Sequence, residues 1–170
     1  MVLINRVFLL KSDKKIIKGK MQNKIKDIKQ ITKDIIDLLK YNAEVMVLEE
    51  GDGVKINIIS SDPSLMIGYN GQNLYALEHV VRLLANKNQE DFVYINLDVA
   101  DYKNKRKSML EDMVKKAVTQ IKKDQKNVEF ESLNPSERKI VHTLCQPIDG
   151  ITSESTGEGQ DRKIIIKVQS

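Results

Sequence analysis

Ile67-Gly68-Tyr69-Asn70-Gly71-Gln72 places two glycines three residues apart between two predicted helices. Glycine has no Cβ, so the backbone of such a loop can pass close to a sugar-phosphate chain. The helix that follows offers unpaired N–H groups and a positive dipole end to a phosphate. A bare G-x-x-G spacing also occurs in many turns that bind nothing. The elements around the loop therefore decide what it means.

Those elements follow the order helix, strand, strand, helix, helix, strand. Residues 24–41 predict an amphipathic helix with a lysine-rich outer face and an apolar face made of Ile25, Ile28, Ile31, Ile35, Leu38 and Leu39. Alternation over 45–58, broken by Gly51-Asp52-Gly53, predicts a hairpin, and residues 92–98 alternate in the same way. A short helix starts after 61–64. The helix after the loop has an apolar face made of Leu74, Leu77, Val81, Leu84 and Ala85.

In this order, the loop followed by Leu74-Tyr75-Ala76-Leu77 resembles the GXXG loop of a type II KH domain, a module that binds single-stranded RNA. KH domains clamp about four nucleotides at that loop. Many KH loops carry Lys or Arg at the two middle positions, whereas this one carries Tyr69 and Asn70. We therefore expect a weaker hold on phosphate here, with Tyr69 stacking on a base.

The second half of the chain predicts a long helix, a short capped helix and a hairpin. The long helix covers 101 to about 126 and presents an apolar stripe made of Leu110, Val114, Ala117 and Ile121. Asn134-Pro135-Ser136-Glu137 predicts a capping box that starts a helix over about 135–146, with Ile140, Val141 and Leu144 facing the core. A hairpin over 151–155 and 163–168 follows.

Arg138 and His142 lie four residues apart on the short helix and so share one of its faces. A guanidinium and an imidazole placed in this way can bind adjacent phosphate oxygens. Taken alone, such a pair is more often an ordinary solvated helix face. The surrounding sequence favours the phosphate-binding interpretation.

Residues 133–142, with 153–159 and Arg162-Lys163, closely resemble the Arg-x-x-x-His domain, which binds single-stranded nucleic acid. Preceded by a KH-like module and the linking stretch 97–103, this arrangement resembles the bacterial Jag family, whose members are also called KhpB or EloR proteins. The resemblance covers about 22–170. Jag proteins usually carry an N-terminal domain of their own, and residues 1–21 are too short to form it.

The resemblance implies a cytoplasmic single-stranded RNA-binding protein, an RNA chaperone or post-transcriptional regulator linked to cell elongation and cell-wall synthesis. Single-stranded DNA is an alternative ligand, a smaller KH-domain protein is the implied heterodimer partner, and a peripheral link to the membrane-insertion machinery is implied. A competing hypothesis is a protein-interaction scaffold whose KH-like module dimerises with little RNA contact. The residues predicted to contact RNA are Gly68, Tyr69, Asn70, Gly71, Gln72, Lys103, Lys105, Arg106, Lys107, Arg138, Lys139, His142, Arg162 and Lys163.

Charge is distributed unevenly along the chain. The net formal charge is +4, but residues 1–40 hold 11 basic and 4 acidic side chains, 41–100 hold 3 and 9, 101–130 hold 9 and 5, and 131–170 hold 5 and 6. A polyanion would therefore meet an opposing charge on the middle segment. We expect the tighter RNA contact at the connecting helix and the C-terminal module.

The composition argues against an enzyme and against a bound metal. One cysteine and two histidines cannot build a typical four-ligand zinc site or a disulfide framework, so we expect no cofactor. Cys145 lies three residues after His142, but no third orienting residue is indicated, and we expect it in the core. Glu154, Glu158 and Asp161 surround a predicted turn, where solvated carboxylates are ordinary. The longest early apolar runs are far shorter than the ~20 residues of a membrane span.

The predicted fold is α+β: a type II KH-like αββααβ module followed by a long helix and a small αβ Arg-x-x-x-His module. The predicted domains are an N-terminal extension over 1–21, the KH-like domain over 22–100, and the long helix with the second domain over 101–170. Within the extension, a strand pair over 6–10 and 15–18 is a further prediction.

Overall fold

A computed structural model describes residues 21–87 and 91–169 of the chain. The strand pair predicted over 6–10 and 15–18 lies outside these residues. The chain divides into two compact units, Met1–Ala100 and Asp101–Ser170, and each unit has a three-stranded sheet of its own.

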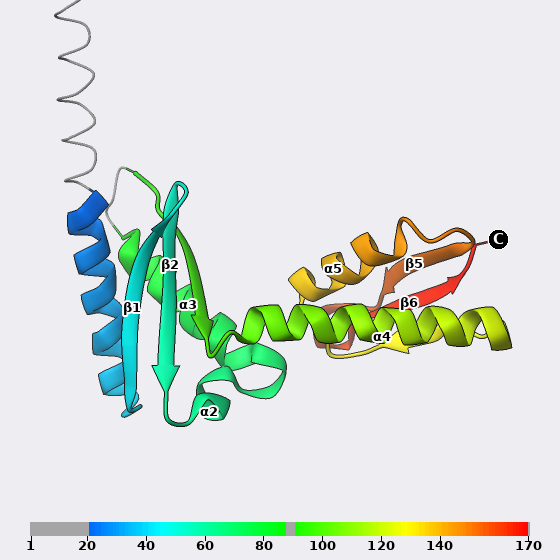
Figure 1. The fold of residues 1–170 in the computed structure, drawn as a ribbon, viewed down its shortest axis with the longest axis horizontal. Coiled ribbons are helices and arrows are strands. Elements are labelled where there is room, and N and C mark those ends of the chain that lie inside the picture. The colour runs from blue at the N-terminus through cyan, green and yellow to red at the C-terminus, as the bar shows by residue number, and fades with distance from the viewer. Residues whose placement is uncertain (1–20, 88–90, 170) are drawn as a thin grey trace, which may run out of the picture. The chain divides into compact units, whose positions relative to one another are not determined.

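The first unit is a three-stranded sheet covered on one face by helices (Figure 1). A helix over 21–38 leads into β1 (Ala43–Glu50) and β2 (Gly53–Ser60), and α2 (Pro63–Ile67), the 3-10 turn η1 (Tyr69–Gly71), α3 (Gln72–Ala85) and β3 (Tyr94–Val99) follow. The sheet order is β1-β2-β3, with β1 antiparallel and β3 parallel to β2. This arrangement confirms the predicted αββααβ order and the α+β class.

The apolar face of the first helix differs from the predicted one at its C-terminal end. The structure buries Ile28, Thr32 and Ile36, which follow one another at intervals of four, while Leu38 is 82% and Leu39 53% exposed. Thr32 is tolerated in the core because its hydroxyl donates to the Ile28 carbonyl at 2.7 Å. The helix ends at residue 38, so its last apolar residues do not reach the sheet.

Two further predictions in this unit need correction. The sequence predicts Leu84 on the buried face of α3, but Leu84 is 44% exposed, and the buried residues of α3 are Leu74, Leu77 and Val81. The third strand begins at Tyr94, two residues later than predicted. The reason is local: the Asn86 side chain accepts from the Val93 N–H at 2.7 Å and donates to the Val93 carbonyl at 3.1 Å, so residue 93 pairs with Asn86.

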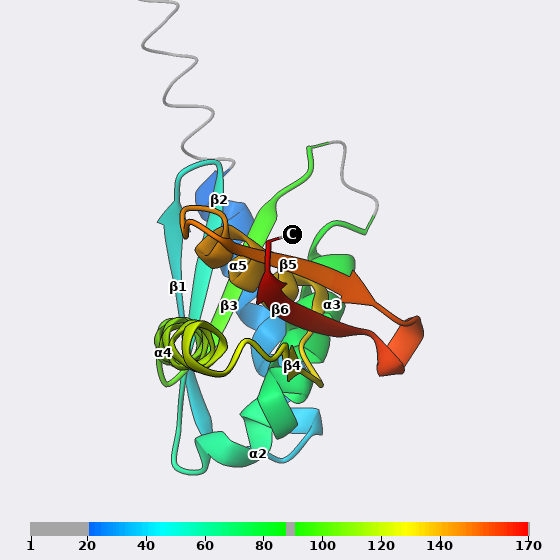
Figure 2. The same cartoon turned by 90° about the vertical axis from the view of Figure 1, so that its right-hand side faces the viewer.

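The second unit is an antiparallel sheet with α4 (Tyr102–Asp124) and α5 (Pro135–Cys145) on one face, as Figure 2 shows with α4 seen end-on. Its strands are β4 (Val128–Phe130), β5 (Ile151–Thr156) and β6 (Lys163–Val168), with the 3-10 turn η2 (Gly159–Asp161) between the last two. The sheet order is β4-β6-β5. The sequence predicted both helices and the hairpin but missed β4, which is only three residues long.

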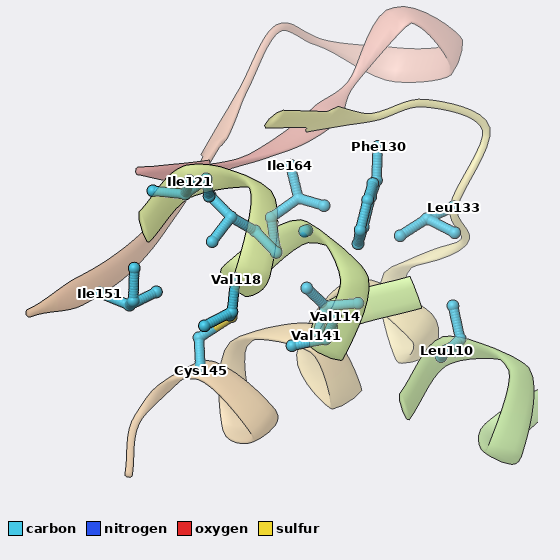
Figure 3. Close-up of a cluster of buried hydrophobic side chains, with 12 residues drawn as sticks. Leu110, Val114, Val118, Ile121, Phe130, Leu133, Val141, Cys145, Ile151 and Ile164 are labelled. Atoms are coloured by element: carbon cyan, nitrogen blue, oxygen red, sulfur yellow. The ribbon is translucent and has the colours of Figure 1, made fainter. Parts of the chain in front are cut away.

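The core of this unit lies between the helices and the sheet (Figure 3). It confirms the predicted α4 stripe and the burial of Val141 and Cys145, while Ile140 and Leu144 pack against it only partly buried. All of its members belong to the second unit: Leu110, Val114, Ala117, Val118, Ile121, Phe130, Leu133, Val141, Cys145, Ile151, Ile164 and Ile166. The unit therefore has a hydrophobic core of its own.

Candidate nucleic-acid interface

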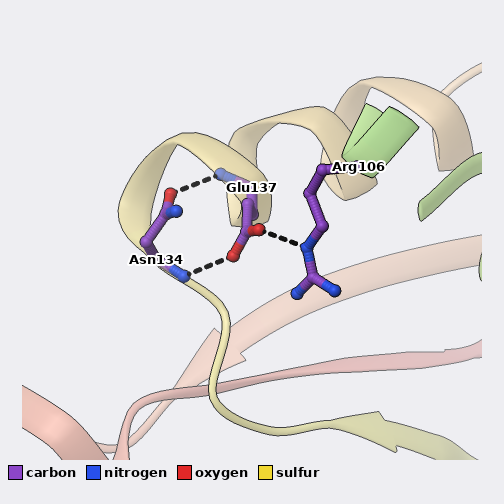
Figure 4. Close-up of polar contacts among 3 residues, drawn as sticks. All are labelled: Arg106, Asn134 and Glu137. Carbon is purple, nitrogen blue, oxygen red and sulfur yellow. Dashed lines mark hydrogen bonds and ion pairs between the residues drawn. The ribbon is translucent and has the colours of Figure 1, made fainter. Parts of the chain in front are cut away.

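The start of α5 is fixed by the capping box that the sequence predicts (Figure 4). The Asn134 side-chain oxygen accepts from the Glu137 N–H at 2.9 Å, and a Glu137 carboxylate oxygen accepts from the Asn134 N–H at 2.9 Å. Pro135 occupies the first turn, where its missing N–H costs nothing. The helix that carries Arg138 and His142 thus begins at a defined residue.

Arg106 reaches this cap from α4 and does not extend into solvent. Its Nε lies 2.6 Å from the second oxygen of Glu137, and the two side chains are only 13% and 2% exposed (Figure 4). The buried carboxylate needs a cationic partner, and Arg106 supplies it. We therefore assign Arg106 a structural role, which joins α4 to α5, and leave it out of the proposed interface.

A shallow hollow of about 440 Å³ lies beside α5 and gathers several of the predicted RNA-contacting residues. Arg138, Lys139 and His142 come from α5, and Arg162 comes from the connection before β6, so residues far apart in sequence line one surface. The remaining lining residues are Pro135, Thr143, Gln146 and Ser155. The cationic side chains of Arg138, Lys139 and Arg162 around one hollow suit an anionic ligand.

His142 is held at both ring nitrogens by β5. Its Nδ1 lies 2.8 Å from Ser153 Oγ and its Nε2 lies 3.0 Å from Ser155 Oγ. Arg138 is held at one end as well, because its Nη1 donates to the Leu133 carbonyl at 2.6 Å. Both side chains of the Arg-x-x-x-His pair are therefore preorganised.

Lys163 is adjacent to Arg162 in sequence but lies on the other face of the sheet. Its ammonium pairs with the Glu129 carboxylate, which raises the pKa of the Lys163 amine. On the same outer face, Lys167 pairs with Glu154 at 2.7 Å. The structure therefore separates Lys163 from the hollow that Arg138, His142 and Arg162 share.

The lysines of α4 do not line the hollow. Lys105 and Lys107 are exposed, and Lys103 is half-buried. Further along the helix, Lys115 lies 3.6 Å from Asp112 in a solvent-exposed pair of the kind that contributes little to stability. These residues offer a basic helix surface outside the hollow.

The glycine loop of the first unit has the backbone conformation that requires glycine. Gly68 and Gly71 have φ of +69° and +79°, and Asn70 between them has φ of +48°. A Cβ on Gly68 would lie 2.5 Å from Cγ of Asn73, whose amide donates to the Leu65 carbonyl at 2.8 Å. The loop is thus pressed against the start of α3.

The residues of this loop that face outward are not basic. Tyr69 is 69% exposed, and Gln72 at the first position of α3 is exposed as well. Tyr69 is thus accessible to a base, as the sequence predicts. Between residues 67 and 72 phosphate could be held only by backbone N–H groups and neutral side chains.

Cys145 is buried, and this burial raises the pKa of its thiol. A thiol in that state is a poor nucleophile, in agreement with the predicted core role. Over residues 21–87 and 91–169, no cluster of His, Cys, Asp and Glu side chains is suited to a metal ion. In the same residues no helix is both long and apolar enough to span a bilayer.

Sequence reasoning missed Ser153, Ser155 and Glu137 as partners of the site. The signal for the serines was present, because Ile151, Ser153 and Ser155 alternate along a strand and must share one face. Ile151 is buried, so the serines had to face the helices too. Glu137 was predicted to cap the helix, but its contact with Arg106 spans 31 residues and has no local signal.

Residues 108–168 match the family model of the Arg-x-x-x-His domain, which is named for this pair of residues and the three between them. The second unit thus defines a protein of the Arg-x-x-x-His class, in which the α5 pair Arg138 and His142 lines the hollow. The chain belongs to the KhpB family. It is 30% identical over 167 residues to the "RNA-binding protein KhpB" of Bacillus subtilis (strain 168), covering 95% of this chain and 80% of that protein.

Two further relatives of the same name agree. The protein from Clostridium symbiosum is 28% identical over 157 residues, which cover 91% of this chain and 71% of the relative. The one from Streptococcus pneumoniae serotype 2 (strain D39 / NCTC 7466) is 25% identical over 151 residues, which cover 84% of this chain and 46% of the relative. These relatives are named as RNA-binding proteins and not as enzymes.

Proposed function

We propose that this protein binds single-stranded RNA, with single-stranded DNA as an alternative ligand, through the hollow beside α5. The observation that carries the proposal is that Arg138, Lys139, His142 and Arg162 line one surface, although two separate segments supply them. The relatives named as RNA-binding proteins support the choice of ligand.

Phosphate is the group that this surface would hold. Arginine donates to phosphate through a planar fork, and Arg138 is already oriented by its bond to the Leu133 carbonyl. The chain has only three Phe, five Tyr and no Trp, so stacking contributes little and charge contributes most. Binding is therefore tolerant of sequence and weakens as salt rises.

The remaining predicted residues fall into a secondary contact. Tyr69, Asn70 and Gln72, with Gly68 and Gly71, would contact the strand at the KH-like loop without a cation of their own. Lys103, Lys105 and Lys107 would attract the backbone over a longer range. The acidic segment 41–100 opposes a tighter contact at the loop.

Arg162 and Lys163 provide a matched pair of variants for the test. In fluorescence anisotropy with a labelled 12-nucleotide oligouridine, Arg162→Ala should weaken binding several-fold and lower the slope of log affinity against log salt by about 0.7, the value for one single-strand phosphate. Lys163→Ala should leave both unchanged, because that ammonium lies on the far sheet face. Equal effects of the two substitutions, or salt-independent binding, would contradict the proposed site.

The protein-interaction scaffold makes a different prediction for the same assay. A scaffold whose KH-like module dimerises with little RNA contact would show no measurable RNA affinity in the wild type. Replacing both Tyr69 and Asn70 by Asp tests the KH-like loop separately, because added negative charge weakens RNA binding but leaves a remote protein interface intact.

We also propose a smaller KH-domain protein as the partner of the first unit. The family resemblance supports this choice, and so does an apolar strip on α3, formed by Val80, Leu83 and Leu84, which are 44%, 57% and 44% exposed. Their spacing of three and four residues places them on one helix face. An apolar face of this kind suits a protein partner better than a polyanion.

The same resemblance supports a cellular role. We propose that the protein acts in the cytoplasm as an RNA chaperone or post-transcriptional regulator in cell elongation and cell-wall synthesis, with a peripheral link to the membrane-insertion machinery. Crosslinking to RNA in cells, followed by sequencing, would identify the transcripts, and enrichment of transcripts unrelated to the envelope would contradict this role.

A further inference from the structure

The two hydrogen bonds on the His142 ring have a consequence for how the hollow recognises phosphate. A neutral imidazole has one N–H donor and one acceptor nitrogen, whereas an imidazolium has two donors. With Ser153 Oγ at 2.8 Å from Nδ1 and Ser155 Oγ at 3.0 Å from Nε2, a neutral ring must accept one serine proton in either tautomer. A protonated ring donates to both oxygens and releases that proton.

The released proton has a ligand to meet at Ser155. Ser155 lines the hollow together with Arg138, Lys139 and Arg162, so its hydroxyl opens onto the surface where phosphate would sit. Ser153 lies further along the strand, faces a second hollow and also bonds the Cys145 thiol. Ser155 is therefore the serine placed to contact a ligand, and Ser153 the one placed to anchor the ring.

We propose that Ser153 and Ser155 are positioning residues for His142, and that the Ser155 hydroxyl donates to an RNA phosphate oxygen when His142 is protonated. The proposal rests on the proposed function and adds a ligand contact to it. The proton comes from solvent and stays on the imidazole while the phosphate is bound. RNA binding thereby takes up a proton, and affinity rises as the pH falls through the range in which histidine titrates.

The charged groups around His142 are compatible with this coupling. Arg138 and Lys139 precede it on α5, Arg162 faces it across the hollow, and the thiol of Cys145 follows it. Glu154, between the two serines, projects to the opposite face and pairs with Lys167. In the part of the chain that the structure describes, no carboxylate lines this hollow, so the phosphate supplies the negative charge that favours the imidazolium.

The test is a pH series of oligouridine binding at constant ionic strength, since uracil and the phosphodiester keep their charge between about pH 5.5 and 8. The wild type should bind about fivefold or more tightly at the lower end of this range than at the upper end, within the limit of tenfold per pH unit for one proton. Ser155→Ala should lose most of this gain, Ser155→Thr should retain it, and His142→Gln should give a flat profile.

Thr143→Ala is the matched control. It also removes a hydroxyl from the lining of the hollow, but that hydroxyl donates to the Lys139 carbonyl at 2.9 Å and is not linked to the ring. It should keep the wild-type pH dependence. Nitrogen-15 spectra give an independent readout, because the chain has two histidines. RNA added at neutral pH should convert the His142 signals to the imidazolium pattern and leave His79 of the first unit unchanged.

The possible failures are distinguishable. If the wild type binds RNA with a flat pH profile, or if Ser155→Ala keeps the full gain, the inference is overturned and the proposed function stands. If the wild type binds no RNA at any pH, both are overturned. A shift of His79 equal to that of His142 would also overturn the inference, because the coupling would then not be local.

Discussion

At the scale of single residues, Glu137 shows how one side chain serves two parts of the second unit. One carboxylate oxygen completes the cap of α5 and the other binds Arg106 of α4. The helix that carries Arg138 and His142 is thereby fixed both at its start and against its neighbour. The sequence predicts the first contact from four consecutive residues, and nothing local predicts the second.

Arg106→Ala should destabilise the protein strongly. It would leave the Glu137 carboxylate buried without a cation, at a cost of about 3–5 kcal/mol in the free energy of unfolding. Urea unfolding followed by circular dichroism measures this cost. The neighbouring Lys107→Ala removes an exposed cation and should change stability by about 0.5 kcal/mol or less. Comparable losses in the two variants would refute the structural role of Arg106.

At the scale of secondary-structure elements, long periodic segments were predicted well and short ones were not. The α4 stripe and the strand pairs have enough repeats to reveal their period. β4 has three residues, and its pairing partner β6 lies far along the chain. The ends of the first helix and of β3 were misplaced because a turn after residue 38 and the Asn86 side chain set them. Periodicity carries no information on either contact.

The loop between α2 and α3 should tolerate a methyl group at Gly68 poorly. Gly68→Ala meets both a positive φ and the Asn73 side chain, whereas Gly150→Ala meets a φ of +74° with no atom within 4 Å. We expect about 1–2 kcal/mol of destabilisation for Gly150→Ala, the cost of the left-handed conformation, and a larger loss for Gly68→Ala. Thermal unfolding of both variants compares them. Gly68→Ala proving the milder change would contradict the close packing of this loop.

At the scale of the whole molecule, the modest net charge hides a division of labour between the units. The predicted preference for the second unit rests on the acidic segment 41–100 and on the hollow beside α5. The sequence indicated Arg138, Lys139, His142 and Arg162 but could not show that Lys163 faces away from them. That separation follows from strand alternation and appears only when the sheet is assembled.

Leu83 and Leu48 allow the partner surface to be tested with equal exposure. Both side chains are 57% exposed, but Leu83 lies in the apolar strip of α3 and Leu48 lies on the open face of the sheet. Leu83→Lys should abolish the complex with a purified smaller KH-domain protein in light scattering coupled to size-exclusion chromatography, and Leu48→Lys should not. A complex lost only with Leu48→Lys would move the interface to the sheet.

The order of the strands in the second sheet has a consequence during synthesis of the chain. β6 is the central strand, and it is the last of the three to be made. A ribosome that adds about 5–20 residues per second needs roughly 2–8 s to proceed from the end of β4 to the end of β6. Throughout that interval the apolar stripe of α4 and Phe130 have no completed sheet to pack against. A newborn chain would therefore pass through a stage in which its first unit is folded while the second depends on chaperones.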